Sequence, residues 1–134
     1  MSSRPNKTPK PPRNEPDIRV VMMPRDTNGE GTIFGGVILS YIDQAAYVEA
    51  RRQAPYRYVT VSMKEVVFKE PVHVGDVLSL YGQTTRIGRT SMTISVKVMA
   101  ERFANHPEIA QVTEAEVVMV AIGDDRKPRE IEIV

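Results

Sequence analysis

The chain contains no cysteine among its 134 residues, and it has no marked excess of charge of either sign. The lack of cysteine excludes disulfides, thiolate metal sites and a cysteine nucleophile, and it is consistent with a reducing compartment. Eighteen basic residues against seventeen acidic ones leave none of the global basic bias that nucleic-acid-binding proteins have.

Long apolar runs are also missing. No run approaches the ~20 residues that span a bilayer, and no apolar stretch of ~7–15 residues follows the basic N-terminus, as a secretory signal requires. A length of 134 residues corresponds to about one domain. A domain of this size can bury a hydrophobic core without disulfides or a structural metal. The sequence therefore predicts one cytoplasmic domain with neither a membrane nor a nucleic acid as partner.

The first sixteen residues differ in composition from the rest, because they hold half of the ten prolines and almost no apolar side chains. Such a segment cannot bury enough surface to offset its ordering entropy. We expect residues 1–16 to be a disordered, basic, proline-rich tail, with a solvated leader favoured over a segment that binds an anionic surface. The folded domain is then expected over residues 17–134.

A long apolar helix is predicted from Gly35 to about Arg52. This segment contains no proline, and Pro55 closes it. At 100° per residue its apolar side chains form one wide arc, made up of Val37, Ile38, Leu39, Tyr41, Ile42, Ala45, Ala46 and Val48. An arc this wide must be covered on most sides, which predicts a central, buried helix.

Alternating apolar and polar residues predict five strands, over residues 18–23, 58–68, 77–87, 92–100 and 114–121. The last four follow one another through short turns, which predicts antiparallel pairing of neighbours. One helix cannot cover both faces of such a sheet, and it is buried most simply if the sheet curls around it. The fold class is α+β, a curved antiparallel sheet wrapped around one long central helix. The other sheet face and the edges favour an oligomer.

One predicted strand changes parity along its length. Val59, Val61 and Met63 share one face, whereas Val66 and Phe68 have the opposite parity. Side chains alternate strictly along a strand, so the change requires an extra residue. We expect a β-bulge near residues 64–65.

Recognisable catalytic motifs are few. The chain has no G-x-S-x-G elbow and no G-x-x-x-x-G-K-[ST] phosphate loop. His73 and His106 both fall in predicted turns without metal-ligand spacing, so we interpret each as a solvated turn residue and expect no metal site. A chemical step without cysteine, paired histidines or a metal needs a carboxylate.

Most acidic residues lie on the polar faces of predicted strands or in the C-terminal tail. Asp43 lies in neither place. On the helical wheel it lies beside Leu39, Ala46 and Ala50, at the border of the apolar arc. Burial of a carboxylate at this border costs solvation free energy unless the carboxylate has hydrogen-bond partners, and burial can shift its pKa. The pattern alone favours a catalytic carboxylate no more than a structural one that has found partners.

Two glycines, Gly35 and Gly36, open the same helix. They permit close backbone approach and leave free N–H groups at the positive end of the helix dipole, which can stabilise an oxyanion. Asp43 lies about 11–12 Å further along the helix axis, too far for both groups to hold one small carbonyl. The spacing suits an assembly in which the helix start of one subunit faces the Asp of another.

Three stretches carry a family resemblance: DTNGEGTIFGGVILSYID from residue 26, YVTVSMKEVVFKEPVHVGD from residue 58, and IGRTSMTISVKV from residue 87. In order and spacing they resemble the bacterial hotdog-fold acyl-CoA thioesterases, in the short-to-medium-chain hydrolase subgroup with an IFGG loop. The resemblance implies hydrolysis of acyl-CoA, with coenzyme A as part of the substrate and no separate cofactor. It also implies a homo-oligomer built from dimers, a tetramer or a hexamer, with a trimer of dimers favoured.

The resemblance also implies roles for residues. Asp43 would be the catalytic general base or nucleophile, Asn28 would position water or thioester across the dimer interface, and Gly36 would polarise the thioester carbonyl. Substrate-binding positions would be Phe34, Gly35 and the turn formed by Gly88, Arg89, Thr90 and Ser91. That turn could hold a phosphate of CoA, with an ordinary hairpin turn as the alternative.

Two other activities fit a hotdog-like pattern. A hydratase or dehydratase would need a histidine in the loop before the helix, and residues 25–36 contain none. A non-catalytic acyl-CoA sensor would lack the carboxylate or carry a DNA-binding helix pair, whereas this chain keeps Asp43. The helix residue Tyr47 and the strand residues Lys64 and Glu65 depart from the family lining, so the resemblance does not extend to acyl-chain preference.

Overall fold

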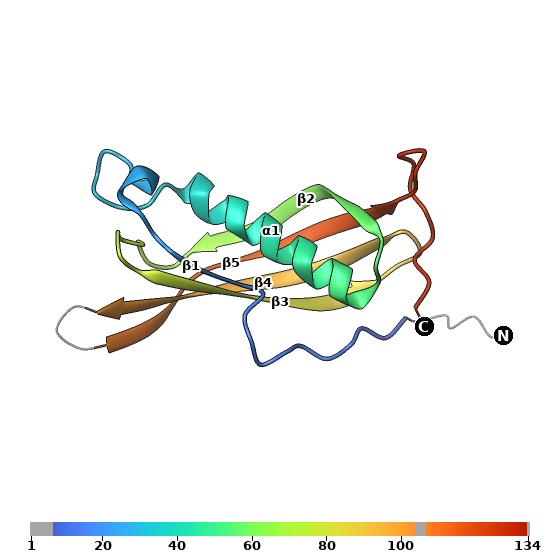
Figure 1. The fold of residues 1–134 in the computed structure, drawn as a ribbon, viewed down its shortest axis with the longest axis horizontal. Helices are drawn as coiled ribbons and strands as arrows, with labels where there is room; N and C mark the ends of the chain where they lie inside the picture. The colour runs from blue at the N-terminus through green and yellow to red at the C-terminus, as the bar shows by residue number, and fades with distance from the viewer. Residues whose placement is uncertain (1–6, 104–106, 134) are drawn as a thin grey trace.

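The computed structural model describes residues 7–103 and 107–133. Its elements are β1 (Ile18–Val21), the 3-10 turn η1 (Pro24–Asp26), α1 (Gly35–Gln53), β2 (Arg57–Phe68), β3 (Val77–Ile87), β4 (Ser91–Phe103) and β5 (Pro107–Ile122). The long helix α1 lies across one face of a curved sheet (Figure 1). Both the element order and the α+β fold class predicted from the sequence are confirmed.

The five strands form one antiparallel sheet in the order β1-β3-β4-β5-β2. The predicted pairing of β3 with β4 and of β4 with β5 is present. The expected pairing of β2 with β3 is wrong, because β2 pairs with β5 and β3 pairs with β1. The connection over residues 69–76 crosses the end of the sheet: Lys69 N–H donates to Val112 O at 2.7 Å, and Asp76 O accepts from Met22 N–H at 2.9 Å. This crossing leaves β2 as a long edge strand.

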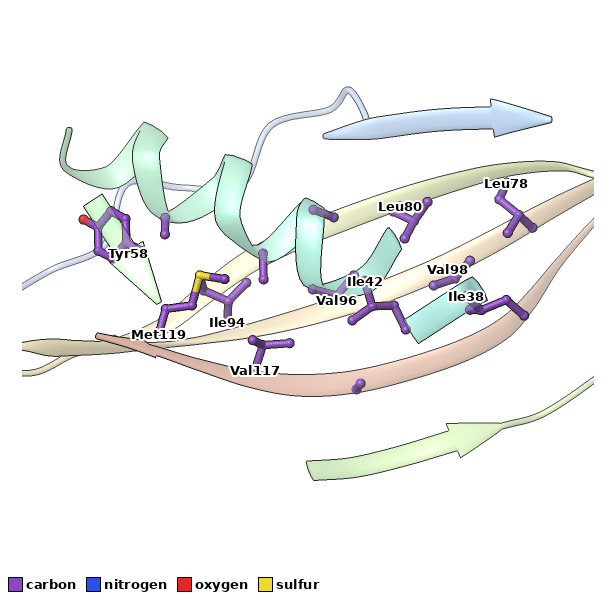
Figure 2. Packing of buried hydrophobic residues seen from close by; sticks show 14 of the residues in the cluster. Ile38, Ile42, Tyr58, Leu78, Leu80, Ile94, Val96, Val98, Val117 and Met119 are labelled. Carbon is purple, nitrogen blue, oxygen red and sulfur yellow. The ribbon is translucent and has the colours of Figure 1, made fainter. Parts of the chain in front are cut away.

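The core lies between α1 and the three central strands. Ile38 and Ile42 of α1 point at the sheet, where Ile94, Val96 and Val117 meet them (Figure 2). The alternating apolar residues of β4 and β5 face inward, since every member is at most 4% exposed: Met92, Ile94, Val96, Val98, Ala100, Ala115, Val117, Met119 and Ala121. Each fully buried valine, isoleucine or methionine of this set stabilises the fold by about 1.5–3 kcal/mol.

The predicted bulge in β2 is confirmed. The pairing of β2 with β5 shifts register between Lys64 and Val67, and Glu65 there has a φ of 55°. After this extra residue, the inward and outward positions of β2 again match those of β5, and Phe68 pairs with the fully buried Thr113.

A second register shift in β2, between Thr60 and Ser62, was not predicted. It makes the expected common face of Val59, Val61 and Met63 wrong. Thr60 pairs with Met119 of β5, whose side chain is buried under α1, whereas Val59 pairs with Val120 and is 43% exposed. The first part of β2 therefore turns Thr60, not its valines, toward the helix.

A buried carboxylate ties the end of α1 to β3. Glu49 is 1% exposed and accepts hydrogen bonds from Arg52 Nε and Thr84 Oγ1, both at 2.8 Å. The helix and strand approach so closely that a Cβ on Gly82 would lie 3.0 Å from Glu49 Cβ and 2.9 Å from an oxygen of Asp17. Only glycine fits there without a shift of the neighbours. Burial is also the main cause that raises the pKa of Asp17.

Residues 7–13, which we call the N-terminal strap, run past the C-terminal end of α1 (Figure 1). Lys10 N–H donates to the Gln53 side chain at 2.7 Å, Gln53 Nε2 donates back to Lys10 O at 3.1 Å, and Arg52 Nη2 donates to Pro11 O at 2.9 Å. The side chain of Gln53 thus pairs with both the N–H and the C=O of Lys10, as the backbone of a neighbouring strand would. The disorder expected over residues 1–16 stays a prediction, and residues 1–6 lie outside the described part of the chain.

No helix within residues 7–103 or 107–133 combines the length and the apolar character needed to cross a membrane.

Candidate active site

Asp43 lies halfway along α1, half-buried on the flank that faces β2. Its Oδ1 accepts a hydrogen bond from the hydroxyl of Thr60 on β2. The unpredicted register shift explains this contact, because it turns Thr60 toward the helix. The carboxylate therefore has a partner that fixes its orientation, and its other oxygen has no hydrogen bond from any described residue.

A cavity of about 720 Å³ adjoins this pair. Its walls include Asp43, Tyr47, Tyr58, Thr60 and Met119, and Asp43 is the one charged residue among the described residues that line it. Tyr58 is fixed in place by a 2.7 Å hydrogen bond from its hydroxyl to Ala54 O. Burial raises the pKa of Tyr58 to about 12, so this hydroxyl stays neutral at physiological pH. The cavity offers an apolar interior with a carboxylate in its wall, which suits an apolar substrate that is attacked at its polar end.

The start of α1 is held by the loop before it. Phe34 N–H donates to Asp26 O at 2.9 Å, and Val37 N–H and Ile38 N–H donate to Phe34 O at 3.1 and 3.5 Å. Within the described part of the chain, the N–H groups of Gly35 and Gly36 have no acceptor. A carbonyl oxygen could therefore be bound at this position, where the helix dipole also favours negative charge.

The side chain of Asn28 shapes its own loop. Its Oδ1 accepts from Glu30 N–H at 2.7 Å and Thr32 N–H at 3.2 Å, and its Nδ2 donates to Thr32 Oγ1 at 2.8 Å. Gly31 completes the turn with a φ of 84°. Residue 28 thus belongs to the same rigid unit as the helix start, with the second Nδ2 proton unused by these bonds.

A smaller cavity, about 290 Å³, lies beside the first helical residue. Gly35, Ile38, Phe68 and Val72 line it together with the charged residues Lys69 and Glu70 of the crossing connection. A Cβ on Gly35 would lie 3.2 Å from Cζ of Phe68. The half-exposed Phe68 ring therefore covers Gly35, whereas the exposed side chain of Phe34 points away from the core.

The turn from Gly88 to Ser91 lies at the other end of α1 (Figure 1). Gly88 N–H donates to Ser91 O at 2.7 Å, and the segment after β5 packs against the turn through a 2.8 Å bond from Ile131 N–H to Arg89 O. Arg89 is exposed, and Lys7 of the strap donates to Gly88 O at 3.3 Å. Cationic groups are present, but the turn also has the hydrogen bonds of an ordinary hairpin.

One subunit thus brings together some of the predicted site residues and separates others. Asn28, Phe34, Gly35 and Gly36 form one unit at the start of α1, Asp43 lies about 12 Å along the helix, and the turn of residues 88–91 is at the far end. Sequence reasoning missed Thr60. The available signal was a threonine whose strand parity differs from that of the flanking valines, and the unpredicted register shift concealed it. No cluster of metal-ligating residues occurs within the described ranges.

Comparison with known proteins gives a consistent result. The family model described as the thioesterase superfamily matches residues 30–102. The uncharacterised acyl-CoA thioester hydrolase ZMO0511 of Zymomonas mobilis is 41% identical over 126 residues, which cover 94% of this chain and 84% of the relative. The acyl-CoA thioester hydrolase YciA of Salmonella typhimurium is 36% identical over 124 residues, with coverage of 91% and 93%.

A solved structure agrees with these sequence matches. Cj0915, a hexameric hotdog-fold thioesterase of Campylobacter jejuni, superposes with a TM-score of 0.86 at 44% identity. The match covers 89% of this chain and 91% of Cj0915.

Proposed function

The chain belongs to the hotdog-fold acyl-CoA thioester hydrolases of the thioesterase superfamily, and we propose that it cleaves acyl-CoA with Asp43 as general base. The products are a carboxylic acid and free coenzyme A. The observation that carries the proposal is the Asp43 carboxylate, oriented by Thr60 in the wall of the 720 Å³ cavity.

The chemistry needs only the groups present. Asp43 accepts a proton from water as the water oxygen attacks the thioester carbonyl carbon, and the carbonyl oxygen becomes an oxyanion. The free N–H groups of Gly35 and Gly36 stabilise this oxyanion. The C–S bond then breaks, and the departing thiolate takes the proton back from Asp43. A placed general base contributes about 10²–10⁴-fold.

The active site is shared between subunits. The helix start and Asp43 of one chain are about 12 Å apart, so the N–H groups that meet a given Asp43 belong to a second copy. The long edge strand β2 supplies a surface for that copy, with Val59, Val61, Val67 and Phe68 between 43% and 56% exposed. Unpaired strand edges of this kind invite pairing with another chain. A hexamer, as in Cj0915, is the assembly we propose.

The activity is tested with purified protein and a panel of straight-chain acyl-CoA esters, with the released thiol detected by a thiol reagent. Asp43→Asn should lower kcat by about 10²–10⁴-fold, with the melting temperature unchanged. An Asp43→Asn protein that turns over at the wild-type rate would remove Asp43 from its proposed role.

Sharing between subunits has its own test. Gly36→Pro removes one N–H at a helix position where proline is tolerated. In a two-fold dimer made from one Asp43→Asn chain and one Gly36→Pro chain, one site carries both changes and the other carries neither. Differently tagged chains, co-expressed and purified as the mixed complex, should therefore regain activity that both parent proteins lack. If the mixed complex stays as inactive as its parents, each site lies within one chain.

A further inference from the structure

The cavity beside Asp43 and the cavity beside Gly35 differ in size and in chemistry. The larger, about 720 Å³, has Asp43 as its one charged wall residue among the described residues, whereas the smaller, about 290 Å³, is bordered by Lys69 and Glu70. An acyl chain is apolar throughout, while the pantetheine arm of CoA carries amides and hydroxyls. The acyl chain therefore suits the larger cavity, and the polar arm suits the surroundings of the smaller one.

Four side chains in the walls of the larger cavity are held in place. Tyr58 is 6% exposed and bonded to Ala54 O, and Met119 is 2% exposed in the middle of the sheet; both lie beneath α1 in Figure 2. Thr60 and Asp43 are bonded to each other. None of these four can move without breaking a hydrogen bond or opening the core.

Tyr47 is the largest side chain in the walls outside these four. It lies one helical turn after Asp43, on the same flank of α1, about 6 Å further along the axis. It is 39% exposed, and its hydroxyl makes no hydrogen bond with any described residue. Tyr47 and Tyr58 both line the larger cavity.

Resting on the proposed function, we propose that Tyr47 is the specificity-determining residue that limits the length of the acyl chain. A carbonyl attacked at Asp43 places the first acyl carbons beside that residue, and the chain then runs along the helix flank toward Tyr47. The ring closes this path one turn away. The length limit is therefore set by one side chain that neither the core nor the reacting groups hold in place.

The test compares the acyl-length profile of kcat/KM for the wild type, Tyr47→Ala and Tyr47→Trp. The cut-off is the longest straight-chain acyl-CoA that retains about one tenth of the best kcat/KM. In Tyr47→Ala, the ester two carbons beyond the wild-type cut-off should gain about tenfold relative to the ester at the cut-off, the discrimination that one or two methylenes give in an apolar pocket. Tyr47→Trp should shift the cut-off to shorter chains.

Matched variants separate the possible explanations. Tyr47→Phe keeps the ring and should keep the wild-type cut-off, which excludes a role for the hydroxyl. Val74→Ala removes an apolar side chain that is 44% exposed and lines neither cavity, and it should leave the profile unchanged. Phe68→Ala enlarges the smaller cavity and should leave the cut-off unchanged.

The outcomes distinguish this inference from the function on which it rests. A wild-type protein that hydrolyses no acyl-CoA contradicts the proposed function itself. A wild type that hydrolyses acyl-CoA, with one cut-off shared by Tyr47→Ala and Tyr47→Trp, overturns the role of Tyr47 and leaves the hydrolase intact. A cut-off shifted by Phe68→Ala instead would place the acyl chain in the smaller cavity.

Discussion

The hydroxyl of Thr60 on the edge strand β2 donates a hydrogen bond to Oδ1 of Asp43 on the central helix. The contact joins two of the elements that border the larger cavity. It occupies one oxygen of the carboxylate and leaves the other for a water molecule. Thr60 is thus a positioning residue for the proposed general base.

Thr60→Val keeps the shape of the side chain and removes the donor. A hydrogen bond to a charged group is worth about 1.5–3 kcal/mol when buried, and Thr60 is exposed in the subunit, so we expect kcat to fall about tenfold, the low end of that range. The KM should change little, because the cavity walls are unchanged. Thr60→Ser keeps the hydroxyl and should retain most of the activity, whereas equal kcat values for wild type and Thr60→Val would contradict the positioning role.

Gly36→Ala separates catalysis from folding. A Cβ at Gly36 meets no atom within 4 Å in the subunit, and alanine is the better helix former, so the melting temperature should stay the same or rise. The added methyl group would lie where the substrate carbonyl approaches the free N–H, so kcat/KM should fall at least about tenfold. Thermal melting and steady-state kinetics on the same preparation check both parts. Unchanged kinetics would show that no substrate group comes close to this backbone.

Gly35→Ala should behave differently from its neighbour. Its Cβ would lie 3.2 Å from Cζ of Phe68, tighter than ordinary van der Waals contact, so the ring or the helix start must shift. We expect both the melting temperature and kcat/KM to fall. The double variant Gly35→Ala/Phe68→Leu relieves the contact and should recover the melting temperature, a recovery that fails if the loss arises elsewhere.

Removal of the N-terminal strap tests its contribution to stability. Deletion of residues 1–13 removes the hydrogen bonds between Lys10 and Gln53 and between Arg52 and Pro11. At about 0.5–1.5 kcal/mol for each of these three bonds, the free energy of unfolding should fall by about 1.5–4.5 kcal/mol. Deletion of residues 1–5 keeps these bonds and serves as the control in denaturant melts. If both truncations have the wild-type midpoint, the strap adds nothing to stability.

The sequence predicted what local patterns determine. The apolar arc placed α1 within one residue of its observed end, and the parity change located the bulge at Glu65, because each signal lies within a few consecutive residues. The strand order was not predictable in the same way, since the connection over residues 69–76 is long enough either to turn back or to cross the sheet.

The candidate site likewise combines residues that local sequence patterns indicate with one that depends on pairing between distant segments. Asp43 and Gly36 were singled out by their positions on one helix, and the family resemblance supplied their predicted roles, which stay predictions. Thr60 was missed because its direction depends on a register shift against β5, a contact between segments about sixty residues apart in the sequence. Pairing at that distance cannot be read from a single strand, so the parity of Thr60 alone did not identify it as the partner of the Asp43 carboxylate.

Tyr58 gives the fold a defined response to alkaline pH. Burial raises its pKa from 10.0 to about 12, so the folded protein keeps this proton over a range in which the unfolded chain has lost it. Stability contributed by the neutral hydroxyl is therefore fully present below pH 10 and is lost as the pH rises toward 12. Two pKa units correspond to about 2–3 kcal/mol at the end of that range.

Tyr58→Phe removes both the titrating group and the hydrogen bond to Ala54 O. At pH 8–9 the variant should be less stable than the wild type by about 1 kcal/mol. Between pH 10 and 11.5 the wild type should lose stability more steeply, so that the two denaturation midpoints converge. Parallel curves for the wild type and Tyr58→Phe would mean that the Tyr58 hydroxyl titrates alike in the folded and unfolded chains.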